Sequence, residues 1–407
     1  MIAPTDQQGL EQLRNASIKL AERWQCEAVA KVTPAESRVG PLTCPATEKL
    51  RSGTELEPGE AWLVPPELDE DGRWLTPAVK WGTRPGSRSH QTEFFGPILS
   101  VMKAKDLDDA IGIVNSTGFG LTSGLQSLDT REQTHWTECI EAGNLYINRT
   151  TTGAIVQRQP FGGLKKSAIG AGTKAGGPNY VLQLLTLEET APPIDGALDE
   201  DSPWLTATQG WEGELSRRFG IDHAEIHKFR TALRSYLVQH GQHFSRENDY
   251  ARLPGQDNRC CYRNVGHLGL WVHGDDTAFS ILAMLAAARI CGNRVSLLAA
   301  PDFDPALADL LNSELAELLM REVAFRTVDD AQLAETISQL DRLRHSGHRL
   351  LPHMALQALA AQGQTAASAP PMQEGRFELL HYLREQSVCV NFHRFGNLGD
   401  HEAAFYP

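Results

Sequence analysis

Basic residues are in deficit in this chain of 407 residues: 38 Lys and Arg face 51 Asp and Glu, and the formal net charge is −13 at pH 7. An acidic surface repels phosphate backbones, so no nucleic acid is expected as a partner. Long hydrophobic runs are also missing. The most apolar stretch, residues 279–290, contains Arg289 and is far shorter than the roughly 20 residues that cross a bilayer. No transmembrane segment is therefore predicted.

Cysteine is scarce, with seven residues scattered over the chain. An odd number without regular spacing argues against a disulfide framework and predicts reduced thiols in a cytoplasmic protein. The N-terminal sequence MIAPTDQQGLEQL has neither the basic nor the apolar region of a signal peptide. It also lacks the start of a recognisable domain, which leaves open whether Met1 is a natural beginning.

The remaining composition is that of a globular protein, since 41% of the residues are hydrophobic and 22% are charged. The first part of the chain alternates predicted helices and short strands. Helices are expected at 9–30, 106–115 and 130–141, and strands at 62–64, 78–81, 98–103, 121–127, 145–148 and 180–187. This alternation predicts an α/β domain with a largely parallel sheet.

A composition break, EETAPPIDGALDEDSP, divides the chain near residue 190. It is acidic and rich in proline, so we expect a linker at 189–203 between a domain at 1–188 and an accessory α/β domain at 204–407. In the second part, a strand (268–273), a helix (277–290) and a strand (294–299) predict a βαβ unit. Low complexity predicts a mobile loop at 361–375, followed by a helix (377–386) and a strand (387–393).

Two residues in the segment QTEFFGP, residues 91–97, are candidates for cofactor binding. Glu93 and Phe95 project to the same side of an extended chain because they are two residues apart. A carboxylate can accept hydrogen bonds from a ribose diol, while an aromatic face packs on a nicotinamide ring. The alternative is an exposed Glu beside a core Phe.

Glycine-rich turns further along are candidates for substrate binding. Phe161 precedes two glycines that permit close backbone approach, so its ring can line a pocket. Gly176 and Gly177, followed by proline, can leave adjacent backbone N–H groups free to bind a carboxylate. The alternative is a tight turn at the entry to a strand.

Several ordered motifs together resemble the aldehyde dehydrogenase superfamily, and within it the L-glutamate γ-semialdehyde (1-pyrroline-5-carboxylate) dehydrogenases. EFFGP (93–97) is similar to the family motif E-x-F-G-P, and similar blocks follow at 115–127, 143–149 and 159–163. VGPL (39–42) matches a further family turn, and KAGGPNY (174–180) resembles the form found in the glutamate-semialdehyde branch.

The resemblance implies NAD-dependent oxidation of a small-molecule aldehyde, L-glutamate γ-semialdehyde, to L-glutamate in proline catabolism. It implies that Glu93 binds the nicotinamide ribose, that Phe95 contacts the nicotinamide and that Phe161 lines the aldehyde pocket. Backbone N–H groups of Gly176 and Gly177 would hold the substrate α-carboxylate. The segment 180–187 resembles the family's interface strand, which implies a homo-oligomer.

The family's catalytic nucleophile has no counterpart in the chain. A Cys thiolate attacks the aldehyde in this family, but Cys26 lies late in the helix predicted at 9–30, and Cys44 lies in a turn without a family counterpart. No catalytic residue is therefore assigned. We interpret the chain as the C-terminal part of a longer enzyme and expect it to be inactive alone. A non-catalytic scaffold with the same fold, or an enzyme for another aldehyde, remains an alternative.

The second part of the chain resembles the accessory C-terminal domain of long proline utilisation A proteins, through LPGQDNRCCY (253–262) and the segments 268–299 and 379–399. This resemblance implies a Rossmann-like fold and a proline dehydrogenase module on the same or a neighbouring polypeptide. VHGDDT (272–277) lacks the G-x-G-x-x-G motif, so no cofactor is expected there. No metal site is predicted either, because His345, His348 and His353 lack companion ligands at metal spacing.

Overall fold

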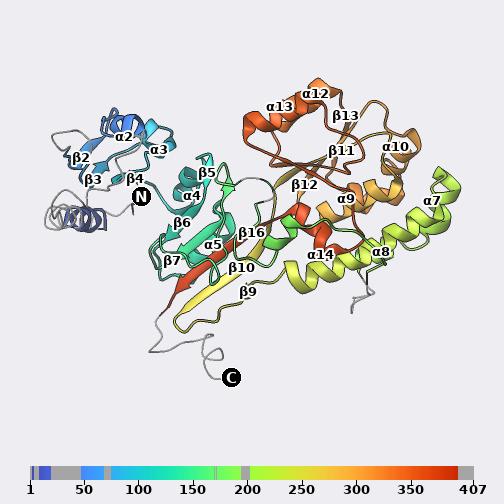
Figure 1. The fold of residues 1–407 in the computed structure, drawn as a ribbon, viewed down its shortest axis with the longest axis horizontal. Helices are drawn as coiled ribbons and strands as arrows, with labels where there is room; N and C mark the ends of the chain where they lie inside the picture. Colours follow the sequence, from blue (N-terminus) through green and yellow to red (C-terminus); the bar gives the residue numbers. More distant parts are fainter. Residues whose placement is uncertain are drawn as a thin grey trace. The chain divides into compact units, whose positions relative to one another are not determined.

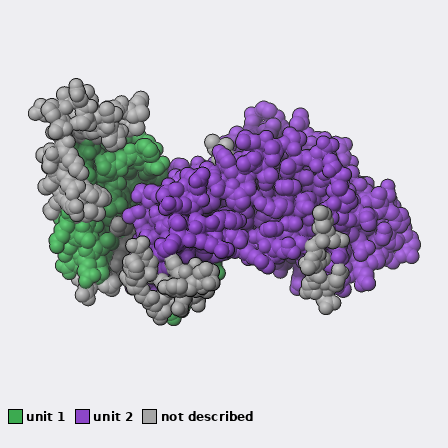
Figure 2. Space-filling view, turned by 60° about the horizontal axis from the view of Figure 1, so that its bottom comes forward, with its two compact units in different colours: residues 1–118, 129–141 green, residues 119–128, 142–407 purple. Residues whose placement is uncertain are grey.

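The computed structural model describes residues 2–3, 9–19, 47–67, 75–168, 170, 172–193 and 202–392. They form two compact units, shown in different colours in Figure 2. Unit 1 comprises Met1–Gly118 and Asp129–Glu141, and unit 2 comprises Phe119–Leu128 and Ala142–Pro407. The chain thus passes between the units more than once, and each unit is described by itself.

Unit 1 contains a four-stranded sheet in the order β1-β4-β3-β2. Its strands are β1 (Ile2–Ala3), β2 (Ala61–Val64), β3 (Ala78–Trp81) and β4 (Ile98–Lys103). Val64, Val79 and Val101 form its core, and the helical segment 9–19 packs against them. The helices of this unit are α2 (Thr47–Ser52), α3 (Arg88–Gln91), α4 (Leu107–Asn115) and α5 (Thr130–Cys139).

Helix α4 begins where the sequence predicts, at a capping aspartate. The Asp106 side chain accepts a hydrogen bond from the Asp109 N–H at 2.8 Å, and the Asp109 carboxylate accepts from the Lys105 N–H at 2.9 Å. These contacts satisfy donors that a helix start would otherwise leave free.

Unit 2 contains a mixed five-stranded sheet in the order β6-β7-β16-β10-β9 (Figure 1). Its strands are β6 (Thr122–Leu125), β7 (Asn144–Ile147), β9 (Asn248–Asp249), β10 (Gln256–Asn264) and β16 (Leu383–Asn391). β16 runs parallel to β7 on one side and antiparallel to β10 on the other. A strand from the end of the chain therefore completes a sheet begun before residue 150. A small sheet pairs β5 (Phe119–Gly120) with β8 (Leu164–Lys165).

A second five-stranded sheet of unit 2 is entirely parallel and has the order β13-β12-β11-β14-β15. Its strands are β11 (His267–Val272), β12 (Arg294–Ala299), β13 (Ala324–Thr327), β14 (Arg342–His345) and β15 (Ala366–Ser368). Helix α9 (Ala278–Ile290) connects β11 to β12 with nearly the expected bounds, and the Thr277 side chain caps it. Numbered along the chain, this order is 3-2-1-4-5, the order of five of the six strands of a doubly wound nucleotide-binding fold.

Helices cover the parallel sheet, and α8 (His223–Gln239) packs along the almost fully buried α9 (Figure 1). The other helices are α6 (Pro203–Ala207), α7 (Trp211–Phe219), α10 (Pro305–Leu311), α11 (Glu317–Met320), α12 (Asp330–Ile337), α13 (His353–Gln362) and α14 (Gly375–Glu378). Single turns of 3-10 helix are η1 (Tyr180–Leu184), η3 (Glu314–Ala316) and η4 (Leu379–Tyr382), and η2 (His240–Phe244) is a π-helical turn. No helix among these described residues is long and apolar enough to cross a membrane.

Several sequence expectations need correction. Residues 180–184 form a 3-10 helix rather than the start of a strand. Within the described part of the chain, no strand pairs with this segment. Residues 361–375 are not a structureless loop, because α13 ends there and β15 joins the parallel sheet. The helix expected at 377–386 stops at Tyr382, where β16 begins.

The division into units also differs from the expected one. Strands β6 and β7 belong to unit 2. Helix α4, which precedes β6 in the chain, and helix α5, which lies between the two strands, belong to unit 1. The pairing of β7 with β16 is the physical reason, since it joins residues on both sides of the expected linker in one sheet. Residues 194–201 of that linker lie outside the described residues, and the linker itself stays a prediction.

Candidate functional site

The segment before β4 places one phenylalanine in the core and the next one outside it. Phe94 is 7% exposed and packs with Leu50 and Leu75, whereas the side chain of Phe95 is 77% exposed. The alternative interpretation of Phe95 as a core residue is therefore wrong, because the core position is taken by Phe94. Phe95 has a backbone φ of 53°, an uncommon conformation for a bulky residue. Strained residues of this kind concentrate at binding sites.

Glu93, two residues before Phe95 in the chain, is also exposed. Among the described residues, none forms a hydrogen bond or an ion pair with its carboxylate. The carboxylate oxygens are therefore available to accept hydrogen bonds from hydroxyl groups of a ligand. Glu93 and Phe95 belong to unit 1, and the other predicted site residues belong to unit 2.

In unit 2, the structure brings the two glycine-rich turns together. The Phe161 N–H donates to the Ala175 carbonyl at 3.0 Å, and the Ala175 N–H donates to the Phe161 carbonyl at 2.9 Å. This antiparallel bridge places the Phe161 backbone one residue away from Gly176. The Phe161 side chain is half-buried. Three of the residues predicted to bind substrate therefore share one local structure.

The two glycines differ in their hydrogen bonding. Gly176 has a φ of 75°, and a Cβ atom at this position would lie 2.5 Å from the Val156 carbonyl oxygen, so the backbone requires glycine. Its N–H has no acceptor among the described residues. The Gly177 N–H instead donates to the Lys174 carbonyl at 2.9 Å, closing a turn. The expected pair of free donors is thus reduced to one, at Gly176.

Lys174, which the sequence analysis did not single out, is completely buried beside this turn. Its ammonium group donates to the Gly162 carbonyl and lies 3.5 Å from Asn144 Oδ1. Burial lowers the pKa of Lys174 to about 8. The side chain ties the turn after Phe161 to the turn that contains Gly176. Its position in KAGGPNY was the only sequence signal for this role.

Two of the described cysteines, Cys260 and Cys261, have no features of a catalytic nucleophile. Cys260 and Cys261 are buried on β10, and burial raises their pKa values to about 12 and about 11. A thiol of this kind is neutral at physiological pH, and the thiolate is the reactive form. Cys26 and Cys44 lie outside the described residues.

The carboxyl edge of the parallel sheet, where doubly wound folds bind ligands, is crossed by ion pairs. Arg349, after β14, donates to Asp275 at 2.8 Å and to both carboxylate oxygens of Asp302 at 3.1 and 2.7 Å. Asp275 follows β11 and Asp302 follows β12, so one guanidinium links three strand ends. Both carboxylates at this edge are thus paired with a cation, and the expectation that no cofactor binds here stays a prediction.

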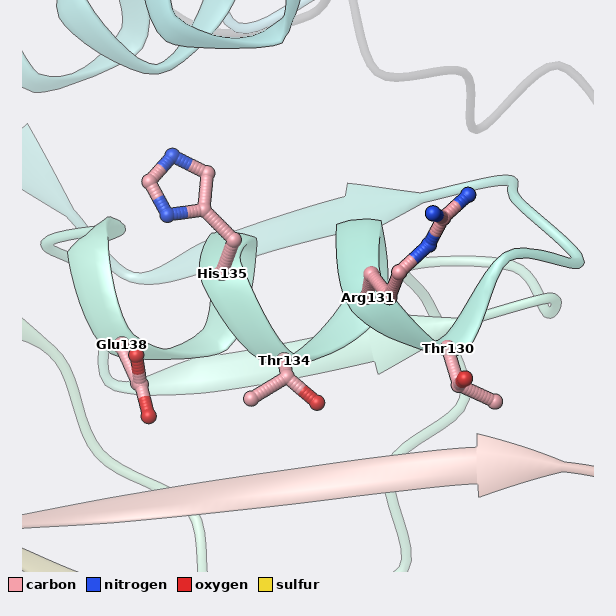
Figure 3. A pocket seen from close by; sticks show the side chains of 5 residues that line it. All are labelled: Thr130, Arg131, Thr134, His135 and Glu138. Atoms are coloured by element: carbon pink, nitrogen blue, oxygen red, sulfur yellow. The ribbon is translucent and has the colours of Figure 1, made fainter.

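Two surface hollows lie apart from the predicted site residues. One, of about 370 Å³, follows a single face of α5 and is lined by Thr130, Arg131, Thr134, His135 and Glu138 (Figure 3). The other, of about 260 Å³, lies beside the π-helical turn η2 and β10. Within the described ranges, no group of three or more His, Cys, Asp or Glu side chains is arranged to hold a metal ion.

Comparisons with known proteins cover both parts of the chain. The aldehyde dehydrogenase family matches residues 36–188. The chain is 33% identical over 177 residues to 1-pyrroline-5-carboxylate dehydrogenase 2 of Bacillus subtilis, which covers 42% of this chain and 34% of that protein. It is 34% identical over 222 residues to the bifunctional protein PutA of Rhizobium meliloti, covering 54% of this chain and 17% of the relative.

A solved structure is also similar. Proline utilization A (PutA) from Corynebacterium freiburgense matches with a TM-score of 0.64 and 33% identity, covering 86% of this chain and 31% of that one. The similarity thus extends beyond residue 188 into the region of the parallel sheet. The chain spans about a third or less of the length of these relatives. Residues 36–188 belong to the aldehyde dehydrogenase family.

Proposed function

We propose that the protein containing this chain oxidises L-glutamate γ-semialdehyde to L-glutamate with NAD, as a step of proline catabolism. The similar proteins named 1-pyrroline-5-carboxylate dehydrogenase and PutA support the substrate assignment. The observation that carries the cofactor assignment is the pair of neighbouring phenylalanines: Phe94 supplies the core contact, while Phe95 is exposed on a left-handed backbone.

The exposed residues fit a nicotinamide cofactor. The Glu93 carboxylate is exposed and unpartnered among the described residues, so it can accept hydrogen bonds from a ribose. The Phe95 ring offers an exposed aromatic face against which a nicotinamide can pack. When bound, NAD supplies the hydride acceptor for the oxidation. Glu93 and Phe95 bind and orient the cofactor in this proposal.

The substrate contacts come from unit 2. The half-buried Phe161 side chain would line the aldehyde pocket, and the free Gly176 N–H would donate to the substrate α-carboxylate. Gly177 would contribute through the turn that its N–H closes with the Lys174 carbonyl. An anchored carboxylate positions the distal aldehyde and discriminates against aldehydes that lack the anion.

We further propose that the protein acts in the cytoplasm as a homo-oligomer, with a proline dehydrogenase module on the same polypeptide. The bifunctional relative supports the module. The apolar side chains of Val181, Leu184 and Leu185 are more than half exposed, which is the kind of surface that a second copy of the chain covers.

The first experiment is to sequence the DNA upstream of Met1 and express the whole encoded polypeptide beside the 407-residue chain. NAD reduction is then measured with glutamate γ-semialdehyde and with propanal. We expect turnover by the whole polypeptide, a preference for the semialdehyde, and no turnover by the chain alone. If the whole polypeptide reduces no NAD, the proposal fails and a non-catalytic scaffold is favoured.

A matched pair of variants tests the cofactor contact. Glu93→Ala should raise the KM for NAD about 10- to 100-fold, the effect of losing a hydrogen bond to a charged group. Glu138→Ala removes a carboxylate from another exposed position, on α5, and should leave this KM unchanged. Equal values for the two variants would remove Glu93 from the cofactor site.

A further inference from the structure

One carboxylate from the end of the chain holds both ends of the segment that carries Gly176. Glu385 lies in β16 and is 3% exposed. Its Oε2 accepts a hydrogen bond from the Lys174 N–H at 2.9 Å, and its Oε1 accepts from Asn179 Nδ2 at 2.6 Å. The segment 174–179 is therefore fixed at its first and last residue by one buried side chain.

Asn179 receives two further contacts from the second part of the chain. Arg376, in α14, donates from Nη2 to Asn179 Oδ1 at 2.7 Å. Asn179 Nδ2 also lies 2.8 Å from the hydroxyl oxygen of Tyr262 in β10. Asn179 is completely buried, so these contacts satisfy an amide that would otherwise destabilise the fold. Three separate elements thus converge on one residue of the KAGGPNY segment.

The middle of the segment also approaches Glu385 closely. A Cβ atom on Gly177 would lie 2.9 Å from the Lys174 carbonyl oxygen and 3.3 Å from Glu385 Oε2. There is no space for a side chain between the turn and the carboxylate. The direction of the free Gly176 N–H, which lies between the two fixed ends, consequently depends on where Glu385 stands.

We propose that Glu385 is a positioning residue for substrate recognition: it fixes the 174–179 segment so that the Gly176 N–H meets the substrate α-carboxylate. This inference rests on the proposed function of Gly176. It gives the second part of the chain a direct role in selecting carboxylate-bearing aldehydes, because Glu385, Arg376 and Tyr262 all follow the expected linker. The contact is formed across more than 200 residues of sequence.

Glu385→Gln is the sharpest variant because it keeps the shape of the side chain but replaces one acceptor oxygen with an NH2 donor. Either the Lys174 N–H or Asn179 Nδ2 then faces a donor, and one end of the segment is released. Glu247→Gln is the matched control. Glu247 forms ion pairs with Arg259 and Arg263 at 2.6 and 3.1 Å, and among the described residues no hydrogen bond or ion pair joins it to 174–179.

The kinetic experiment uses the whole encoded polypeptide with glutamate γ-semialdehyde and propanal. Glu385→Gln should raise the KM for the semialdehyde about tenfold or more, with kcat changed much less, as expected for a weakened hydrogen bond to a charged group. The kcat/KM for propanal, which has no carboxylate to anchor, should stay within about twofold. Arg376→Gln should also raise the KM for the semialdehyde. Glu247→Gln should leave the kinetic constants for both aldehydes unchanged.

A second measurement uses the 407-residue chain and does not depend on activity. Backbone hydrogen exchange at Lys174 should be faster in Glu385→Gln than in wild type or Glu247→Gln, because this N–H donates to Glu385. Unchanged exchange, or equal kinetic losses for both aldehydes, would overturn the inference. If the wild-type polypeptide does not oxidise the semialdehyde while the exchange effect is present, the proposed function fails and the positioning contact itself stands.

Discussion

Arg344 Nη2 lies 3.0 Å from Glu378 Oε1, and neither side chain is exposed to solvent. The Glu378 carboxylate also accepts hydrogen bonds from the Tyr382 hydroxyl at 2.7 Å and from the Met372 N–H at 2.9 Å. Burial raises the pKa of Glu378, but the Arg344 charge, His381 and the hydrogen bonds from Met372 and Tyr382 together outweigh it, so the pKa is lowered. The pair connects β14 of the parallel sheet to α14, just before β16.

Glu378→Leu should therefore be strongly destabilising, because it leaves the buried Arg344 charge without its partner. A loss of about 3–5 kcal/mol in the free energy of unfolding is typical of such a change. The double variant Arg344→Met/Glu378→Leu removes both charges and should recover a large part of that loss. Denaturant unfolding of the 407-residue chain measures both values. A double variant less stable than the single one would contradict this account of the pair.

The buried Lys174 should make the free energy of unfolding depend on pH in the alkaline range. Burial lowers its pKa to about 8 from an ordinary value of 10.5, so between these pH values the unfolded chain binds a proton that the folded chain does not. The free energy of unfolding should therefore rise with pH across this window, by up to about 3 kcal/mol from this residue. The difference in unfolding free energy between wild type and Lys174→Met isolates the effect. Lys166→Met, at an exposed position, should show no such trend.

His345 makes the corresponding prediction for acid. It is 2% exposed at the end of β14, and burial, the charge of Arg344 and the proximity of His273 lower its pKa to about 4. Between pH 6.5 and 4 the unfolded chain binds a proton that the folded chain excludes, so the free energy of unfolding falls as the pH falls. His345→Gln should lose less stability than wild type over this range. His227→Gln, at an exposed helix position, should follow the wild-type curve.

Local signals in the sequence predicted local structure well. Asp106 and Thr277 mark helix starts that the structure confirms, and the βαβ unit around α9 has nearly the expected bounds. The strand order was not accessible in this way, because β16 pairs with β7 and β10 through contacts that no local pattern encodes. The apolar residues 180–187 were predicted as a strand for the same reason: apolar composition does not reveal whether a partner strand is present.

The residues of the candidate site also differ in whether a local sequence motif identifies them. Motif residues such as Glu93 and Gly176 were identified from sequence, whereas Lys174 and Glu385 were not. Glu385 lies in a segment predicted as the end of a helix, so its position on a buried strand face was unforeseen. A buried charge that holds a distant turn has no signature in its own neighbourhood of the sequence. The role of Glu385 can be recognised only once the structure shows that β16 lies between β7 and β10.

Phe94 and Phe95 provide a last comparison of neighbouring residues with identical chemistry. Phe94→Ala removes a buried ring packed on Leu50 and Leu75 and should reduce the free energy of unfolding by about 3 kcal/mol. Phe95→Ala removes an exposed ring, so its effect on stability should be within about 0.5 kcal/mol. In the whole encoded polypeptide, Phe95→Ala should nevertheless raise the KM for NAD. If Phe95→Ala destabilised the chain as much as Phe94→Ala and left that KM unchanged, Phe95 would be a structural residue and the cofactor assignment would lose its main support.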